Sequence, residues 1–135
     1  MTNLNDPNPD RSPYHLLGGE TVVRAMVDAF YDTMDEDPDF YGIRKLHASS
    51  LDGARTKLFM FLCGWLGGPQ LYVAQYGHPR LRARHSPFAI GISERDQWLA
   101  CMARAMALVG VEPTLRAQLQ ASFMNTADWM RNKEG

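Results

Sequence analysis

The sequence of 135 residues has little net charge and no long run of apolar residues. Its 14 basic and 15 acidic side chains give a formal charge of −1, so electrostatics offers no reason to expect a nucleic acid or an anionic membrane as partner. No apolar run approaches the roughly 18 residues that a membrane-spanning helix needs. The first residues also lack the basic start and apolar centre of a signal peptide. We therefore expect a cytoplasmic protein with neither a nucleic-acid nor a membrane partner.

Cysteine is scarce as well. Cys63 and Cys101 are far apart, and each falls within an apolar pattern of helical spacing. A zinc site or a redox-active pair would need cysteines at close spacing. Free cysteines often occupy protein cores, so we predict two buried thiols without a disulfide.

Sustained alternation of polar and apolar residues, which would indicate a sheet, is missing. Apolar residues instead recur at helical spacing in four long segments. The predicted helices run from residue 20 to the Asp37-Pro38 pair, over residues 51–66, from a cap at Ser93 to Val109, and over residues 113–131. Residues 38–50 are predicted to form one helical turn and a loop. The predicted fold class is all-α.

The length suits a single domain. Residues 1–13 are rich in Asn, Asp and Pro and poor in apolar side chains, so they have little to bury. We predict a flexible arm over residues 1–13 and one domain over residues 14–135.

The segment 70–91 is the least regular part of the predicted domain, because glycines and prolines interrupt it. Only one short helix is expected there, over residues 79–85, with Pro79 in its first position and His85 at its end. A plain helical bundle has no need of a proline-flanked histidine between its helix pairs. His85 is therefore either an iron ligand or a surface residue favoured by the negative end of a helix dipole.

Neighbouring polar groups leave both interpretations open. Arg82 and Arg84 precede His85 closely enough for a guanidinium to reach a carboxylate of a bound group, although most arginines simply lie in solvent. Tyr31 and Trp98 place a hydroxyl and an indole N–H on apolar helix faces. Such groups also serve structural roles by bonding a nearby carbonyl.

Several motifs together carry a resemblance to a known family. They are LLGGE at residues 16–20, FY at 30–31, IRKLH at 43–47, GWLGGP at 64–69, GHPRLRARHSPF at 77–88 and ERDQWL at 94–99. With these motifs the chain resembles the group II truncated haemoglobins, and the resemblance covers nearly all of it after residue 13. It implies a two-over-two helical sandwich around a haem.

The resemblance also implies roles for individual residues. His85 would be the proximal ligand of the iron in haem b, and the small Ala54 would leave a path open to the opposite, distal side. His47 stands where other members carry an aromatic residue such as tyrosine. The implied haem contacts are His85, Arg84, Phe61, Leu58, Phe88 and Tyr72, and the implied distal pocket consists of Tyr31, His47, Trp98 and Ala54.

The function implied by this resemblance is reversible binding of oxygen, nitric oxide or carbon monoxide, together with oxygen and nitric-oxide redox chemistry. Hydrogen-bond donors beside a bound gas ligand would slow its release, which argues against bulk oxygen transport. A peroxidase-like activity ranks lower, because no Asp or Glu lies within several residues of His85. The expected partners are gas ligands, peroxide in the peroxidase case, and an unidentified reductase, with a monomer or homodimer as the assembly. The alternative from a different class is a cofactor-free helical interaction module.

Overall fold

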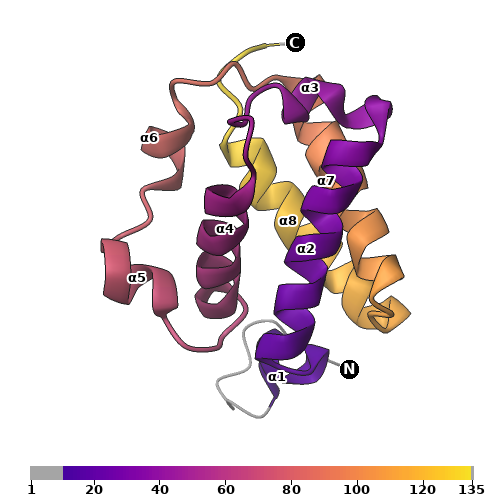
Figure 1. The fold of residues 1–135 in the computed structure, drawn as a ribbon. Coiled ribbons are helices and arrows are strands. Elements are labelled where there is room, and N and C mark those ends of the chain that lie inside the picture. Colours follow the sequence, from indigo (N-terminus) through magenta and orange to yellow (C-terminus); the bar gives the residue numbers. More distant parts are fainter. Residues whose placement is uncertain (1–10, 135) are drawn as a thin grey trace.

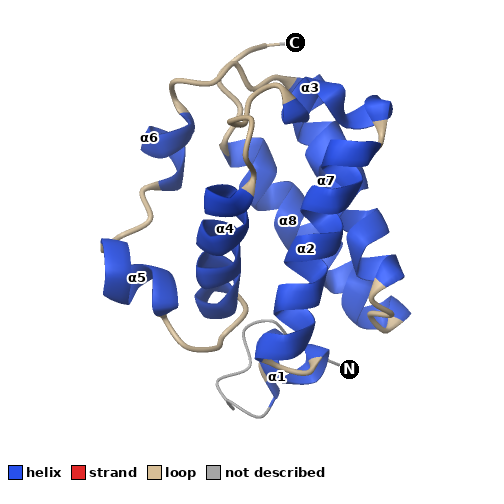
Figure 2. Cartoon of the chain, in the orientation of Figure 1, coloured by secondary structure: helices blue, strands red, loops and turns tan. Residues whose placement is uncertain are grey.

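The structure is a computed structural model that describes residues 11–134. Most of the predicted arm lies outside this range. Within it the chain is helical and contains no strand, which confirms the all-α prediction (Figure 2). The elements are α1 (Pro13–Leu17), α2 (Glu20–Glu36), the short 3-10 turn η2 (Pro38–Phe40), α3 (Tyr41–Arg44), α4 (Asp52–Trp65), α5 (Leu71–Tyr76), α6 (Leu81–His85), α7 (Ile92–Leu108) and α8 (Pro113–Trp129).

The long helices form two pairs. Helix α2 packs on both α4 and α7, and α7 packs on α8 (Figure 1). The core lies between these pairs, where Phe30, Leu62, Met102 and Leu119 contribute one side chain from each long helix and are at most 1% exposed. Burial of such large apolar side chains is the main favourable term in folding. The two-over-two arrangement predicted from the resemblance is thus present.

Several predicted boundaries are confirmed. Helix α2 ends before Pro38, whose ring disfavours a helical conformation in the preceding residue. Residues 38–50 form η2, the single turn α3 and a loop, as expected. Helix α8 begins at Pro113, and the carboxylate of Glu112 accepts hydrogen bonds from the backbone N–H groups of Thr114 and Leu115.

Helix α1 was not predicted, because the start of the chain has few apolar residues. The Ser12 side chain caps it by accepting a hydrogen bond from the His15 N–H, at 3.3 Å. Tyr14 anchors it to the turn after α4, where its N–H donates to the Leu66 carbonyl at 2.9 Å. A Cβ atom at Gly68 would lie 2.6 Å from the Tyr14 ring, so this close approach requires glycine.

The predicted cap of α7 at Ser93 is wrong. The cap residue is Gly91, whose N–H donates to the Glu94 carboxylate at 2.7 Å. A Glu three residues after the cap makes this bond readily. The Ser93 hydroxyl instead accepts a hydrogen bond from the Gln97 side chain at 3.1 Å.

The segment 70–91 holds two short helices, whereas one was predicted. Helix α5 packs against α4 and ends at Gly77, which has a φ of 78°. Pro79 is not the first residue of α6, because Arg80 has a left-handed backbone with a φ of 49° and the helix begins only at Leu81. The His78 ring accepts a hydrogen bond from the Arg80 N–H at 3.0 Å, a local bond that favours this turn over an earlier start.

Both cysteines are free and fully buried, as predicted. Burial raises the pKa of the Cys63 thiol to about 11 and that of Cys101 to about 12. The Cys101 thiol donates a hydrogen bond to the Phe30 carbonyl at 3.2 Å. Within residues 11–134, no helix combines the length and the apolar character that a membrane span requires.

Candidate functional site

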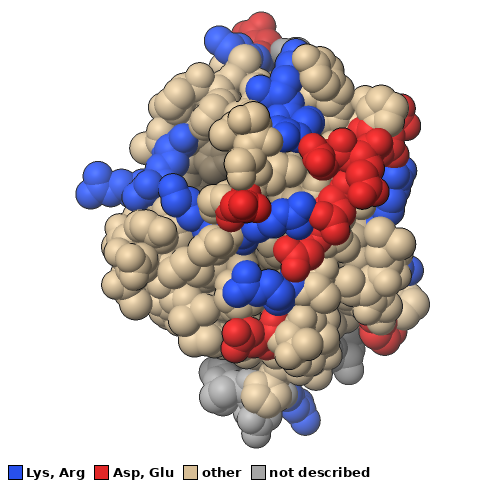
Figure 3. Space-filling model, viewed as in Figure 1, with Lys and Arg blue, Asp and Glu red and all other residues tan. Residues whose placement is uncertain are grey.

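Helix α6 stands apart from the core. None of its five residues is buried, in contrast to the long helices, each of which buries one face. The space-filling view shows a hollow on this side of the molecule, between α6 and the chain that leads into α4 (Figure 3). His85, the last residue of α6, is half-buried.

The local structure fixes the chemical form of the His85 ring. Its Nδ1 atom lies 2.6 Å from the Leu81 carbonyl oxygen. A carbonyl only accepts hydrogen bonds, so Nδ1 carries the proton and donates it. In the neutral ring the lone pair is then on Nε2, which is the arrangement found in metal-bound histidines.

Helix α4 has two apolar faces. Phe59, Leu62 and Cys63 face the core and are at most 4% exposed. The second apolar face is only partly buried, and its side chains are Ala54, Leu58, Phe61 and Trp65.

The partly buried stripe of α4 is turned toward the side of the molecule that carries α5. The rings of Phe61 and Tyr72 meet edge to face, with centroids 6.3 Å apart. Tyr72 itself is 8% exposed. These apolar side chains are only partly covered by the described residues, so they suit contact with a large apolar group.

A second set of polar groups comes from α2 and from the loop after α3. Tyr31 of α2 is buried, and its ring meets the His47 ring edge to face at a centroid distance of 5.7 Å. The His47 Nδ1 atom lies 2.8 Å from the Ile43 carbonyl oxygen, so this ring also keeps Nε2 free. Burial raises the pKa of the Tyr31 hydroxyl far above its ordinary value, so the side chain stays a neutral donor.

The protonation state of His47 is equally well defined. Burial is the largest effect and lowers its pKa, while the hydrogen bond to the Ile43 carbonyl opposes that change. The charges of Arg44 and His85 lower the pKa of His47 further. With its pKa lowered below the ordinary value of about 6.5, His47 is neutral near pH 7.

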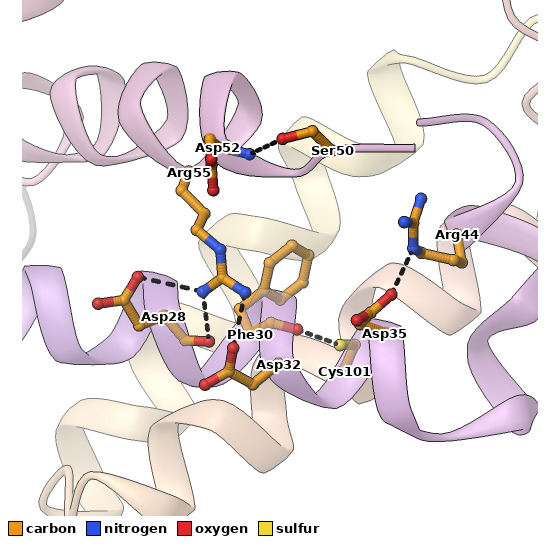
Figure 4. A network of polar contacts seen from close by, with 9 residues as sticks. All are labelled: Asp28, Phe30, Asp32, Asp35, Arg44, Ser50, Asp52, Arg55 and Cys101. Carbon is orange, nitrogen blue, oxygen red and sulfur yellow. Dashed lines mark hydrogen bonds and ion pairs between the residues drawn. The ribbon is translucent and has the colours of Figure 1, made fainter. Parts of the chain in front are cut away.

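Arg44 holds the loop that carries His47. Its Nε atom donates to the Asp35 carboxylate of α2 at 2.8 Å (Figure 4). Its two terminal nitrogens donate to the carbonyls of Ala48 and Ser49 at 2.9 and 2.8 Å. Guanidinium groups suit such forked contacts.

Arg55 makes a similar link between α4 and α2. Its terminal nitrogens lie 3.2 Å from the Asp28 carboxylate and 2.6 Å from that of Asp32 (Figure 4). The guanidinium carbon is also 5.9 Å from the centre of the Tyr31 ring. These contacts fix the start of α4 over the part of α2 that carries Tyr31.

Trp98 of α7 lies close to Tyr31, because the Phe30 ring contacts both side chains. The Phe30 ring is 5.0 Å from the Tyr31 ring and 5.2 Å from the Trp98 ring, measured between centroids. Trp98 is half-buried and also contacts Phe123, which stacks on Trp65 at 4.8 Å. No hydrogen bond engages the Tyr31 hydroxyl or the Trp98 indole within the part of the chain that the structure describes.

The remaining predicted site residues divide into two groups. The Arg84 Nε atom donates to the Pro79 carbonyl at 2.8 Å, and its guanidinium carbon is 5.8 Å from the centre of the Tyr72 ring. Arg84 thus lies with Tyr72 and Phe61. Phe88 lies in the loop after α6, is 40% exposed and makes no ring contact with the described residues.

A haem suits this set of residues. Within residues 11–134, no cluster of three or more His, Cys, Asp or Glu side chains could hold a bare metal ion. A metal on His85 would therefore take its other ligands from a cofactor. A porphyrin supplies four nitrogens, its flat apolar body suits the half-buried face of α4, and its carboxylates suit the arginines of α6.

Comparison with known proteins identifies the family. The family model described as bacterial-like globin matches residues 12–132. The chain is also 38% identical over 122 residues to the group 2 truncated hemoglobin YjbI of Bacillus subtilis (strain 168), covering 90% of this chain and 89% of that protein. The chain belongs to the group II truncated haemoglobins.

Solved structures agree with this assignment. This truncated haemoglobin is similar to the cold-adapted truncated hemoglobin of the Antarctic marine bacterium Pseudoalteromonas haloplanktis TAC125, with 44% identity and a TM-score of 0.88 over 91% of this chain and 99% of that one. It is likewise similar to the group II 2-on-2 hemoglobin of the plant pathogen Agrobacterium tumefaciens, with 37% identity and a TM-score of 0.88. That match covers 99% of this chain and 100% of the other. The predicted family and fold are therefore confirmed.

Some residues that shape the site of this truncated haemoglobin were missed. The carbonyls of Leu81 and Ile43 lie four residues before His85 and His47, so helical spacing alone could have identified them. Arg44 stands inside the IRKLH motif, but its sequence context does not reveal its acceptors. Asn132, which bonds the loop after His85, gave no local signal because it is more than 40 residues away.

Proposed function

We propose that this truncated haemoglobin binds haem b through the Nε2 atom of His85 and reversibly binds oxygen and other small gas ligands. The family implies haem-based gas binding. The observation that carries the proposal is the hydrogen bond from His85 Nδ1 to the Leu81 carbonyl, which leaves the Nε2 atom of the neutral ring free to bind a metal. When bound, haem would supply an iron that can bind oxygen, nitric oxide or carbon monoxide.

The proposed haem contacts follow from the placement of the side chains. Leu58 and Phe61 belong to the half-buried stripe of α4, and Tyr72 faces Phe61 from α5. Arg84 keeps terminal nitrogens available for a propionate while its Nε atom is engaged with Pro79. Phe88 is proposed as a further contact because its exposed ring follows His85 by three residues.

On the distal side, Tyr31 and Trp98 are proposed to donate hydrogen bonds to the gas ligand, and His47, whose free Nε2 atom is an acceptor, is proposed to line the pocket beside them. The Tyr31 hydroxyl and the Trp98 indole make no hydrogen bond elsewhere in the described chain, and hydrogen bonds to a charged acceptor contribute about 1.5–3 kcal/mol each. Slow release of oxygen favours its reaction with nitric oxide over its transport. Ala54 is proposed to leave an entry path, because its side chain is small.

Gas binding is favoured over peroxidase chemistry by the partner of His85. Peroxidase function calls for a carboxylate that draws the Nδ1 proton and makes the ligand more electron-rich. The Nδ1 partner here is the neutral carbonyl of Leu81. We propose that an electron-donor protein keeps the iron ferrous.

Titration with haemin tests the proposal. The purified chain should take up one haemin per chain and develop a strong Soret band, and after reduction it should bind carbon monoxide. His85→Ala should lose or severely alter this band. His15→Ala, a change at an exposed histidine on α1, serves as the matched control and should bind haemin normally. A wild-type chain that is fully folded and stays colourless with excess haemin would refute the proposal.

A further inference from the structure

Helix α6 depends on other parts of the chain for its position. It buries none of its five residues, and the Arg80 backbone before it is left-handed. Packing of its own side chains therefore contributes little to where it lies. The position of α6 must therefore depend mainly on contacts made by its ends and by the loop that follows it.

The end of the chain makes most of those contacts, through Asn132. The Asn132 Oδ1 atom accepts a hydrogen bond from the Ile90 N–H at 2.9 Å. Its Nδ2 atom donates to the Phe88 carbonyl at 2.7 Å and to the His85 carbonyl at the longer distance of 3.5 Å. The backbone N–H groups of Asn132 and Lys133 both donate to the Ile90 carbonyl, at 2.8 and 3.1 Å.

A second contact reaches α6 itself from the same segment. The guanidinium carbon of Arg82 lies 4.7 Å from the centre of the Trp129 ring, a distance suited to a cation–π interaction. Trp129 is the last residue of α8, three positions before Asn132. The segment 129–133 therefore contacts α6 near its start and holds the chain at and beyond its end.

This segment is itself firmly placed. Helix α8 buries Leu115, Leu119 and Phe123 in the core, and Met130 directly after the helix is buried as well. Asn132 thus connects a rigid helix to the loop that begins at His85. Bonds to three groups along that loop restrict the rotation of the His85 backbone, and with it the direction of the Nε2 lone pair.

We propose that Asn132 is a positioning residue that fixes the orientation of His85 toward the haem iron. The Trp129–Arg82 contact supports the same role from the other end of α6. The inference rests on the proposed function, because it concerns how firmly His85 holds a haem. It extends the proximal side of the site to a residue 47 positions away in the sequence.

Two variants of Asn132 and one matched control test the proposal. Asn132→Ala removes all side-chain bonds to the loop, whereas Asn132→Asp keeps the acceptor for the Ile90 N–H and loses the donors to Phe88 and His85. Asn125→Ala is the control, since Asn125 is an exposed asparagine of α8 whose side chain makes no hydrogen bond within the described residues. The readouts are the rate of haem transfer to excess apomyoglobin and the iron–histidine stretching band of the ferrous protein in resonance Raman spectra.

We expect Asn132→Ala to lose haem about tenfold faster than wild type, with a shifted or broadened iron–histidine band, because the change removes the side-chain hydrogen bonds that hold the loop after His85. Asn132→Asp should fall between the two, and Asn125→Ala should match wild type. Unchanged transfer rates and bands in both Asn132 variants would overturn the proposal. If Asn132→Ala does not fold, Asn132→Asp decides alone. A wild-type chain that takes up no haem would instead refute the proposed function.

Discussion

The rings of Tyr31 and His47 meet edge to face with their centroids 5.7 Å apart, although they come from different elements. Tyr31 lies on α2, and His47 lies in the loop after α3. The His47 Nδ1 atom is engaged with the Ile43 carbonyl, so the free polar atoms of the pair are the Tyr31 hydroxyl and His47 Nε2. The pair therefore places two polar atoms, the Tyr31 hydroxyl and His47 Nε2, among mostly apolar side chains.

Removal of single donors should accelerate the release of oxygen. Tyr31→Phe and Trp98→Phe each delete one donor and keep the ring. With about 1.5–3 kcal/mol for a hydrogen bond to a charged acceptor, each change should raise the oxygen dissociation rate by roughly 10- to 100-fold. Stopped-flow displacement of oxygen by carbon monoxide measures this rate.

Tyr41→Phe provides the matched control for the distal variants. Tyr41 is 63% exposed, so loss of its hydroxyl should leave the rate unchanged. Dissociation rates that stay at the wild-type value in both Tyr31→Phe and Trp98→Phe would rule out the proposed role of these donors.

Replacement of Arg44 should destabilise the protein. Arg44→Met keeps the aliphatic stem and removes the bonds to Asp35, Ala48 and Ser49. The Arg44 side chain is 20% exposed, so we expect a loss of about 1–3 kcal/mol in the free energy of unfolding. Urea denaturation of the holoprotein measures it.

The neighbouring Lys45 supplies the control for Arg44. Lys45 is exposed, and Lys45→Met should change the free energy of unfolding by less than about 0.5 kcal/mol. Equal stabilities of the two variants would show that the Arg44 contacts do not hold the loop.

Stability should depend on pH through His47. Its pKa in the folded protein is lowered, chiefly by burial, below the value of about 6.5 expected in the unfolded chain. The unfolded chain therefore binds more protons in the acidic range, so the contribution of His47 is complete above about pH 6.5 and is lost as the pH falls through the folded pKa. Thermal unfolding between pH 5 and 8 should show this loss in wild type.

The variant His47→Gln isolates this effect. It should show a weaker decrease in the unfolding temperature between pH 6.5 and 5 than wild type does. The carboxylates of Asp37 and Asp128 also have lowered pKa values, but protonation of these groups acts at lower pH. The same pH slope in wild type and His47→Gln would contradict the assignment.

Burial should also protect the cysteines. Cys63 and Cys101 are fully buried, with pKa values raised to about 11 and 12, so little thiolate is present at neutral pH. We expect no reaction of either thiol with a disulfide reagent in the native protein and reaction of both in denaturant. Rapid modification of the native protein would contradict the buried placement.

The sequence predicted the parts of the fold that depend on periodicity. The apolar stripe of α2 and the proline after it defined that helix, because burial and backbone sterics are local properties of the chain. Helix α1 escaped prediction since Tyr14 is stabilised by a close approach to Gly68, more than 50 residues away. The cap of α7 was misplaced because the Gly91 N–H bonds the Glu94 carboxylate and the helix begins before Ser93.

In the candidate site, too, local features were predicted and contacts between distant parts of the chain were not. His85 and Tyr31 were found from the family motifs, and the carbonyl partners of both histidines follow from helical spacing. The bond of Asn132 to the loop after His85 depends on how α8 packs, which no local pattern encodes. The sequence likewise did not reveal that α4 has two apolar faces, because one of them is defined by its contact with α5.

The visible spectrum of His85→Gly, with and without added imidazole, tests the central claim most directly. The glycine removes the ring and leaves space in which free imidazole can bind. We predict that the reduced, carbon-monoxide-treated variant lacks the wild-type Soret band and regains it when imidazole is added. A wild-type spectrum in His85→Gly without imidazole would contradict the assignment of His85 as the iron ligand.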